Sequence, residues 1–468
     1  MAVTHSIRIF VVVTLFCFSS AYFGTEPKRN DHCFCQLKGS IDECGCSVDT
    51  VDHFNNKKIY PRLKSLLQKD YFRFYKVNLK RECPFWADDS RCAMRYCHVE
   101  PCLEEDIPPG LKGRHLRELP FEEDMSVKYT ESVQAEDCEV DHDDDLGYLN
   151  TTISAAAYEE FARWKEHDDA LDNFCDINSD DDDAQYVDLS LNPERYTGYK
   201  GKSAHRIWNS IYKENCFRPK NSFNSYIASS KLNGMCLEKR VFYRVISGLH
   251  ASINIHLCSN YLLSEKSTLS FDSVTGQWGP NLEEFLLRFD PRKTEGEGPQ
   301  WLRNLYFLYL LELRALVKAA PYLEREEYYT GNDQEDEDVR QAVKDILRVV
   351  RSFPEHFNES VMFTGGSQAR KLKEEFRQHF RNISHIMDCV GCEKCKLWGK
   401  LQVHGLGTAL KILFSGKFDG VDPTGADLSH MAKSQFQLHR SEIVALLNAF
   451  GRLSTSIYEI ERFRGMMR

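Results

Sequence analysis

The chain has 468 residues, of which 42% are hydrophobic, so it can bury one large core or two or three ordinary ones. Its formal net charge of −10 is concentrated in acidic runs, which argues against nucleic acid or an anionic membrane surface as a partner. The chain has seventeen cysteines, so the first point to establish is whether they meet an oxidising or a reducing compartment.

The first 23 residues have the pattern of a secretory signal peptide. Arg8 is followed by an apolar run over 9–16 and by small residues at 19–21. This run is too short to span a bilayer. We therefore expect residues 24–468 to form the mature protein as a single domain.

The remaining cysteines would then meet an oxidising compartment, where pairing into disulfides is the default. Glycosylation sequons at Asn150, Asn358 and Asn382 agree with this route. The C-terminus carries no retention signal of the Lys-Asp-Glu-Leu type.

Four cysteines near the N-terminus form two symmetric Cys-x-Cys pairs around a turn. This symmetry indicates a nested hairpin, with Cys33–Cys46 outside and Cys35–Cys44 inside. A four-thiolate zinc knot is the alternative, but the oxidising compartment favours disulfides.

The segment 54–80 is predicted to be a helix followed by an aromatic run. Next come Cys83, Cys92, Cys97 and Cys102. Residues 103–147 have few apolar side chains and many acids, so we expect a long mobile loop that contains Cys138. Such a loop could carry a dithiol between a partner and a buried site, or could be closed by a fixed disulfide.

The middle of the chain has a predicted helix over 152–168 and an acidic patch around Cys175. The run 186–201 that follows mixes glycine, tyrosine, arginine and threonine, with Trp208 just beyond. These residue types can stack a flat ring system and bind a phosphate, but a packed turn uses the same types. Cys216 and Cys236 bracket a polar loop that we expect them to close.

The C-terminal half has helical periodicity throughout. Helices are predicted at 237–263, 282–289, 301–317, 338–352, 368–387, 397–414 and 441–465. Helix 301–317 is apolar on nearly every face and should therefore be central. No alternating strand pattern is visible. We expect a mainly α fold, a single large helical domain with a disulfide-rich, irregular N-terminal region.

Cys389, Cys392 and Cys395 recur at every third position between two predicted helices. A Cys-x-x-Cys pair at a helix start has its thiolate favoured by exposed N–H groups and the helix dipole. An iron–sulfur site lacks its fourth cysteine and usual proline, and a haem site lacks the histidine after Cys395. Zinc would need a fourth ligand from elsewhere, and two structural disulfides remain open.

Five stretches stand in the order seen in one known family: 70–86, 191–201, 246–254, 304–310 and 387–395. In them the chain closely resembles the endoplasmic reticulum oxidoreductins, flavin-dependent thiol oxidases that re-oxidise protein disulfide isomerase. The resemblance runs from about residue 33 to the C-terminus.

The resemblance implies a role for most of the cysteines. The inner redox pair would be Cys392 and Cys395, with Cys395 reacting with the flavin, and the outer, shuttling pair would be Cys92 and Cys97. The other implied pairings are the structural bridge Cys83–Cys389 and the regulatory bridges Cys92–Cys138 and Cys97–Cys102.

The resemblance also implies an FAD-binding helical core. The matching contact residues are Arg195, Thr197, Trp208, Ser247, His250 and Arg288, with Tyr199 nearby. Gln300 and Trp301 stand where relatives usually have two basic residues, one of them a phosphate contact. A dinucleotide fingerprint is absent, because Leu410 takes its third glycine position and no strand precedes it.

The implied function is oxidation of protein disulfide isomerase, with electrons passing to FAD and then to oxygen to give hydrogen peroxide. We expect a monomer in the endoplasmic reticulum lumen, with peripheral association to the membrane left open, and no metal. Two other classes stay in view: a chaperone-like binding protein, and a disulfide-exchange enzyme without flavin.

Overall fold

The body of the protein is built from two closely packed pairs of long helices, α7 with α9 and α12 with α13. These helices span Leu237–Ser259, Gly298–Leu323, Glu393–Phe414 and Arg440–Met466, respectively. The computed structural model describes residues 48–86, 97–112, 174, 181–195, 202–212, 237–264, 277–353, 367–414 and 438–468. Within these ranges the fold is mainly α, as the sequence predicts.

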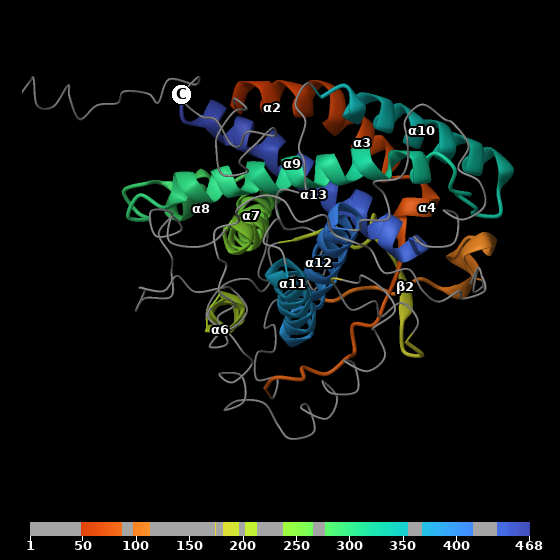
Figure 1. Ribbon diagram of the computed structural model, residues 1–468, viewed down its shortest axis with the longest axis horizontal. Helices are drawn as coiled ribbons and strands as arrows, with labels where there is room; N and C mark the ends of the chain where they lie inside the picture. The colour runs from red at the N-terminus through yellow and green to blue at the C-terminus, as the bar shows by residue number, and fades with distance from the viewer. Residues whose placement is uncertain are drawn as a thin grey trace, which may run out of the picture.

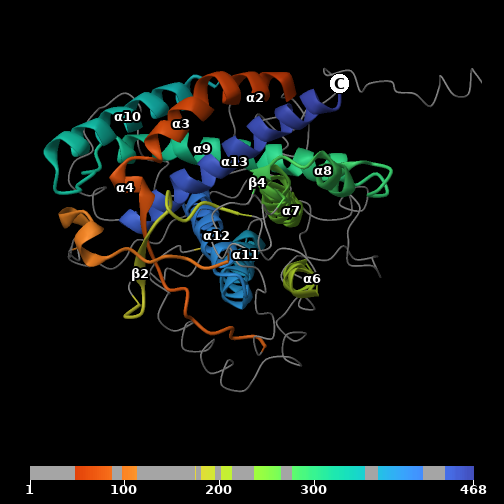
Figure 2. The same cartoon turned by 180° about the vertical axis from the view of Figure 1, so that it is seen from behind.

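Helix α9 runs through the length of the molecule, with α13 beside it (Figure 1). A layer of α2 (Val48–Phe54), α3 (Tyr60–Leu66) and α10 (Asp333–Arg351) covers one side, and α11 (Ser367–Ile386) lies with α12 on the other, which Figure 2 shows from behind. A single π-helical turn, Asn55–Ile59, joins α2 to α3. Most of α9 is buried, which agrees with the prediction that this helix is central.

Two glycines allow the paired helices to approach closely. A Cβ atom on Gly405 of α12 would lie 2.3 Å from the carbonyl oxygen of Ala445 on α13. A Cβ atom on Gly248 of α7 would lie 2.5 Å from the carbonyl oxygen of Asn304 on α9. Only glycine fits at either crossing, because real Cβ atoms do not come so near a backbone.

Two small antiparallel sheets lie at the edge of the helical body. Strand β1 (Phe74–Val77) pairs with β2 (Gln185–Asp188), and β3 (Tyr261–Ser264) pairs with β4 (Gln277–Gly279). The sequence shows no alternation because strands of three or four residues are too short to display one. Helix α7 consequently ends at Ser259, before the predicted residue 263, and the chain turns into β3.

The first part of the expected mobile loop belongs to the packed body. Residues 103–112 contain two short 3₁₀ turns, Glu104–Asp106 and Pro109–Leu111. The N–H of Gly110 donates to the carbonyl oxygen of Thr330 at 2.9 Å, and the Tyr186 hydroxyl donates to the carbonyl oxygen of Leu111 at 2.6 Å. Composition alone missed these long-range bonds of residues 103–112; residues 113–147 lie outside the described ranges.

Most of the remaining helices follow the predictions closely, but α10 begins at Asp333, before the predicted residue 338, and α12 begins at Glu393, before the predicted residue 397. Helix α8 (Leu282–Phe289) has the predicted bounds, α11 differs by one residue at each end, and α4 (Asp70–Arg73) and α6 (Lys202–Ser210) are short. The predicted helix 152–168 lies outside the described residues, as do the four N-terminal cysteines. Among the described helices, none combines the length and apolar character needed to cross a lipid bilayer.

Candidate active site

The turn between α11 and α12 carries Cys392 and Cys395. The backbone N–H of Lys396 donates to the carbonyl oxygen of Cys392 at 2.8 Å, so Cys392 takes the N-cap position of α12. The N–H of Cys395 lies 3.4 Å from the Cys392 sulfur. Both residues are present as thiols, 2% and 4% exposed.

The third cysteine of the triplet, Cys389, is joined to Cys83 by a disulfide that links positions 306 residues apart in the sequence. This is the bridge that the resemblance implies. A metal site built on all three sulfurs is thereby excluded, since a disulfide sulfur is not a thiolate ligand. In the described parts of the chain, no three His, Cys, Asp or Glu side chains gather as metal ligands.

A buried ion pair fixes the residue next to this disulfide. The Lys400 ammonium donates to Asp388 Oδ1, and Arg81 Nε lies 3.8 Å from Oδ2. Burial raises the pKa of Asp388, while Lys400 and then Arg81 oppose the rise. Removing one partner would leave a buried charge, so this pair ties the cysteine turn to the body of α12.

Cys97 lies against this same turn. Its carbonyl oxygen accepts the N–H of Lys394, between the two inner cysteines, at 2.9 Å. The Glu393 carboxylate accepts the Val99 N–H at 2.9 Å and lies 3.0 Å from His98 Nδ1. The segment that carries one proposed outer cysteine is therefore hydrogen-bonded to the turn that carries the inner pair. Cys92 lies outside the described residues.

A buried asparagine holds the next residue of the segment. Asn192 Oδ1 accepts the N–H of Glu100 at 2.9 Å, and Asn192 Nδ2 donates to the carbonyl oxygen of Glu100 at 2.9 Å. The indole N–H of Trp398 donates to the Asn192 carbonyl at 3.1 Å. Asn192, which belongs to the run 186–201, therefore anchors the segment that carries Cys97 and Cys102.

Cys102 follows two residues after Glu100 in the described segment 97–112. Its N–H donates to the carbonyl oxygen of Tyr186 at 2.8 Å. The implied regulatory bridge between Cys97 and Cys102 stays a prediction. Burial, followed by Asp188 and Asp106, raises the pKa of Cys102 to about 11, which keeps this thiol protonated at neutral pH. Cys138, the implied regulatory partner of Cys92, lies outside the described residues.

Glu194 anchors the chain just before Arg195. Its carboxylate accepts from Arg452 Nη2 at 2.7 Å and lies 3.3 Å from His256 Nδ1. Burial alone would raise the pKa of Glu194, but Arg452, followed by His256, holds it below its ordinary value. The Arg195 guanidinium stacks 5.0 Å from the centre of the Trp278 ring. Burial, followed by the Arg195 charge, lowers the pKa of Lys394.

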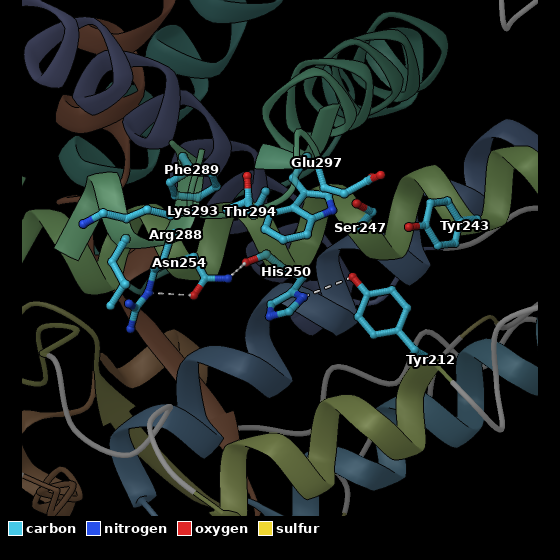
Figure 3. A pocket seen from close by; sticks show the side chains of 13 residues that line it. Tyr212, Tyr243, Ser247, His250, Asn254, Arg288, Phe289, Lys293, Thr294 and Glu297 are labelled. Atoms are coloured by element: carbon cyan, nitrogen blue, oxygen red, sulfur yellow. Dashed lines mark hydrogen bonds between the residues drawn. The ribbon is translucent and has the colours of Figure 1, made fainter. Parts of the chain in front are cut away.

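A cavity of about 300 Å³ opens between α7, α8 and the start of α9. It combines aromatic walls with a few polar and charged groups. The lining residues are Tyr212, Tyr243, Ser247, His250, Ala251, Asn254, Leu287, Arg288, Phe289, Lys293, Thr294, Glu297 and Trp301. In Figure 3, Arg288 and Lys293 stand toward one end and Tyr212 and Tyr243 toward the other. Such a lining suits a ligand with flat rings and an anionic group.

Hydrogen bonds hold the polar side chains of this cavity. The Tyr212 hydroxyl lies 3.1 Å from His250 Nδ1, and Arg288 Nε donates to Asn254 Oδ1 at 3.1 Å (Figure 3). Arg288 also donates to Glu284 at 2.7 Å. Burial, followed by the Arg288 charge, lowers the pKa of His250 to about 3, so its imidazole is neutral at physiological pH.

The structure brings four of the seven predicted cofactor residues to this region. Ser247, His250 and Arg288 line the cavity, and the Trp208 ring stacks on His250 with ring centres 3.7 Å apart. Arg195 does not line the cavity. Thr197 and Tyr199 lie outside the described residues.

Several lining residues were not predicted as contacts, notably Tyr212, Tyr243, Asn254 and Lys293. Tyr243 precedes Ser247 by four residues and Asn254 follows His250 by four, so the helical periodicity of α7 could have identified them. Tyr212 and Lys293 come from other elements, and no local pattern in the sequence marks them.

The other predicted sites are described only in part. Asn382 lies on α11, 1% exposed, and its Oδ1 accepts from Gln378 at 3.1 Å. Attachment of carbohydrate there stays a prediction. Asn150, Asn358, Cys216 and Cys236 lie outside the described residues.

Comparison with known proteins gives consistent matches. The family model described as Endoplasmic Reticulum Oxidoreductin 1 matches residues 58–460. An Ero1-like protein of Drosophila melanogaster is 56% identical over 465 residues, with 96% of this chain and 94% of that protein covered. The ERO1-like protein alpha of Homo sapiens is 49% identical over 474 residues, with 96% and 95% covered.

One solved structure of S. cerevisiae Ero1p, described as a source of disulfide bonds for oxidative protein folding in the cell, is 29% identical. It superposes with a TM-score of 0.55 and covers 90% of this chain and 98% of its own.

Proposed function

The chain belongs to the endoplasmic reticulum oxidoreductin 1 family, and from this membership we propose that it is a thiol oxidase of the endoplasmic reticulum lumen that re-oxidises protein disulfide isomerase. The family name supports an oxidoreductase of that compartment. The observation that carries the two-site scheme is the 2.9 Å hydrogen bond between the Cys97 carbonyl and the Lys394 N–H. It joins the outer segment to the turn of the inner pair.

The first step is thiol–disulfide exchange at the outer pair. A thiolate of reduced isomerase attacks the Cys92–Cys97 disulfide, breaking the S–S bond and forming a mixed disulfide. The second isomerase thiol then displaces the outer cysteine. The isomerase leaves oxidised, and Cys92 and Cys97 remain as two thiols.

The second step transfers the two electrons inward. An outer thiolate attacks the Cys392–Cys395 disulfide, and a second exchange leaves the outer pair oxidised and the inner pair as thiols. The N-terminal N–H groups of α12 stabilise the thiolate that leaves. FAD, when bound, would accept the two electrons of the inner dithiol and deliver them to oxygen, giving one hydrogen peroxide for each disulfide.

The cavity residues fit this cofactor. The Arg288 and Lys293 side chains would face its diphosphate, and the aromatic rings of Trp208, Tyr212 and Trp301 would offer flat surfaces for its ring systems. Neutral His250 can exchange a hydrogen bond without repelling the Arg288 charge. These side chains bind and orient the cofactor, and the cysteines carry the exchange.

A second function, disulfide exchange without flavin, is favoured by one observation. Trp301 lines the cavity at one of the two positions where oxidoreductins usually carry basic residues. If the loss of that charge abolished cofactor binding, the two cysteine sites would still exchange disulfides with a partner, but no electrons would reach oxygen.

A visible absorption spectrum of the purified protein, taken before and after denaturation with no flavin added, separates the two functions. A flavin spectrum that is released on unfolding supports the oxidase. A colourless folded protein would favour simple disulfide exchange. Peroxide formed in step with thiol consumption is the second requirement of the oxidase.

The two-site scheme is tested with Cys92→Ala. This variant should keep most of its oxidation of a small dithiol, which can reach the inner pair directly, and should lose oxidation of reduced isomerase. Equal loss of both activities would contradict the scheme.

We further propose that Cys92–Cys138 and Cys97–Cys102 bridges form when partner thiols are scarce, which would withdraw the outer pair from exchange.

A further inference from the structure

We propose that the Glu393 carboxylate is a latch that holds the Cys97 segment against the inner cysteine pair, so that Glu393 is a positioning residue for electron transfer between the two sites. This inference rests on the proposed function for its purpose. The contacts that define the latch are independent of that function.

The latch is formed by residues adjacent in sequence on each side. On the outer segment, Val99 N–H and His98 Nδ1 lie 2.9 Å and 3.0 Å from Glu393 Oε2. On the inner turn, the N–H of Lys394 donates to the carbonyl oxygen of Cys97 at 2.9 Å. Glu393 and Lys394 are the two residues between the inner cysteines, so these three contacts bring Cys97 to that pair.

The two ends of the outer segment are held differently. Asn192, 2% exposed, brackets Glu100 with two hydrogen bonds of 2.9 Å, and Cys102 bonds to Tyr186. The Glu393 side chain, in contrast, is 46% exposed and the His98 side chain 71% exposed. Water competes for the latch but not for the Asn192 bracket, so the segment can open at Cys97 while Glu100 acts as its pivot.

Opening the latch would have one direct consequence. Cys97 is only 8% exposed when the segment is closed, which protects its sulfur from a bulky protein partner. Release of residues 97–99 would expose this sulfur to the isomerase, and closure would return it to the inner pair. The latch must therefore be weak enough to open in every cycle.

The direct test is the alkylation rate of Cys97 in full-length protein whose redox-active cysteines are reduced while the Cys83–Cys389 disulfide stays intact, followed by mass spectrometry after timed exposure to iodoacetamide. Glu393→Ala removes both contacts and should raise this rate about three- to tenfold, since one to two solvated hydrogen bonds to a charged group are lost. Glu393→Gln keeps an acceptor and should give a smaller rise. An unchanged rate in Glu393→Ala would overturn the proposal.

The matched control is Glu104→Ala. Glu104 is an exposed acid farther along the same described segment, in a 3₁₀ turn, and the variant should alkylate like the wild type. His98→Ala tests the latch from its other side without changing the inner turn, and should raise the rate less than Glu393→Ala. A rise in Glu104→Ala equal to that in Glu393→Ala would assign the effect to general loop charge and reject the latch.

The rates of isomerase oxidation and small-dithiol oxidation give a functional test of the latch. The ratio of isomerase oxidation to small-dithiol oxidation should fall at least threefold in Glu393→Ala, because only the isomerase route uses the outer segment. An equal fall in both activities would assign Glu393 to the chemistry of the inner pair and overturn the latch. Faster alkylation in a protein that neither binds flavin nor makes peroxide would support the latch and reject the oxidase.

Discussion

The inner cysteine pair and the outer segment lie against each other but are held by opposite kinds of contact. The turn of the inner pair is fixed by the Cys83–Cys389 disulfide and the Asp388–Lys400 ion pair, whose side chains are 1% and 8% exposed. The outer segment meets this turn through Glu393 and His98, both well exposed to water. Changes on the inner side should therefore reduce catalysis or stability, whereas changes on the outer side should alter rates of exchange.

Removing one inner cysteine should have the largest effect. In Cys395→Ala, oxygen uptake with a small dithiol should fall to the rate of buffer alone, because Cys392 can no longer form the inner disulfide. An oxygen electrode measures the loss. Cys258→Ala is the control: Cys258 is another buried thiol, 0% exposed, and its loss should leave oxygen uptake intact. Persistent uptake in Cys395→Ala would show that a different pair feeds electrons to oxygen.

Removing the disulfide that fixes the inner turn should have the second largest effect. Cys83 and Cys389 are 306 residues apart, and a cross-link over so long a loop stabilises the folded chain by roughly 5 kcal/mol in the chain-entropy account. The double variant Cys83→Ala/Cys389→Ala should lose about that much free energy of unfolding, measured with urea under non-reducing conditions. Cys258→Ala should cost only about 1 kcal/mol. A double variant no less stable than this control would mean that the bridge does not constrain the protein.

Acidification tests the buried ion network that anchors Glu194. Burial lowers the pKa of His256 to about 4, with Glu194 opposing and Arg452 adding to the shift, against 6.5 for an ordinary histidine. In this pH range His256 therefore binds a proton in the unfolded chain but not in the folded chain. The free energy of unfolding consequently falls as the pH drops from 6.5 toward 4.

From pH 7 to pH 5, this histidine should account for a loss of up to about 2 kcal/mol. Urea midpoints at both pH values should show a smaller loss in His256→Gln than in the wild type. His205→Gln, on the exposed side of α6, should follow the wild type. Parallel losses in wild type and His256→Gln would contradict the assignment.

The smallest expected effect concerns the cavity. Lys293 lines it, lies in an exposed turn and makes no ion pair with any described residue, so its charge is available to an anionic ligand. Lys293→Ala should release flavin about threefold faster, as judged by fluorescence after dilution, and the difference should shrink at high salt. Arg292→Ala removes an exposed charge next to it that does not line the cavity. Equal acceleration in both variants would remove Lys293 from the site.

Helical periodicity predicts most of the fold because each long helix buries a regular apolar face. Helix α13 matches its predicted range to within one residue at either end. Helix α9 is longer than predicted at both ends, from Gly298 to Leu323, because Gly298 and Pro299 at its start and Pro321 near its end conceal the pattern.

The site is predicted less completely, because side chains meet there from distant parts of the chain. The cysteine spacing and the family resemblance together identify the inner pair, but neither indicates that Glu393 would reach Val99, 294 residues away in sequence. Composition likewise assigns residues 103–112 to a mobile loop, because the bond from Gly110 to Thr330 is invisible to any local pattern.

The distance along the chain between Cys83 and Cys389 also bears on biosynthesis. A ribosome that adds about 5–20 residues per second needs roughly 15–60 seconds to cover the 306 positions between them. Until Cys389 emerges, the bridge that fixes the inner turn cannot close, and the two cysteines that follow it do not yet exist outside the ribosome. Under the proposed function, a nascent copy of this protein therefore lacks the inner pair, and transfer of electrons to oxygen begins only when translation is nearly complete.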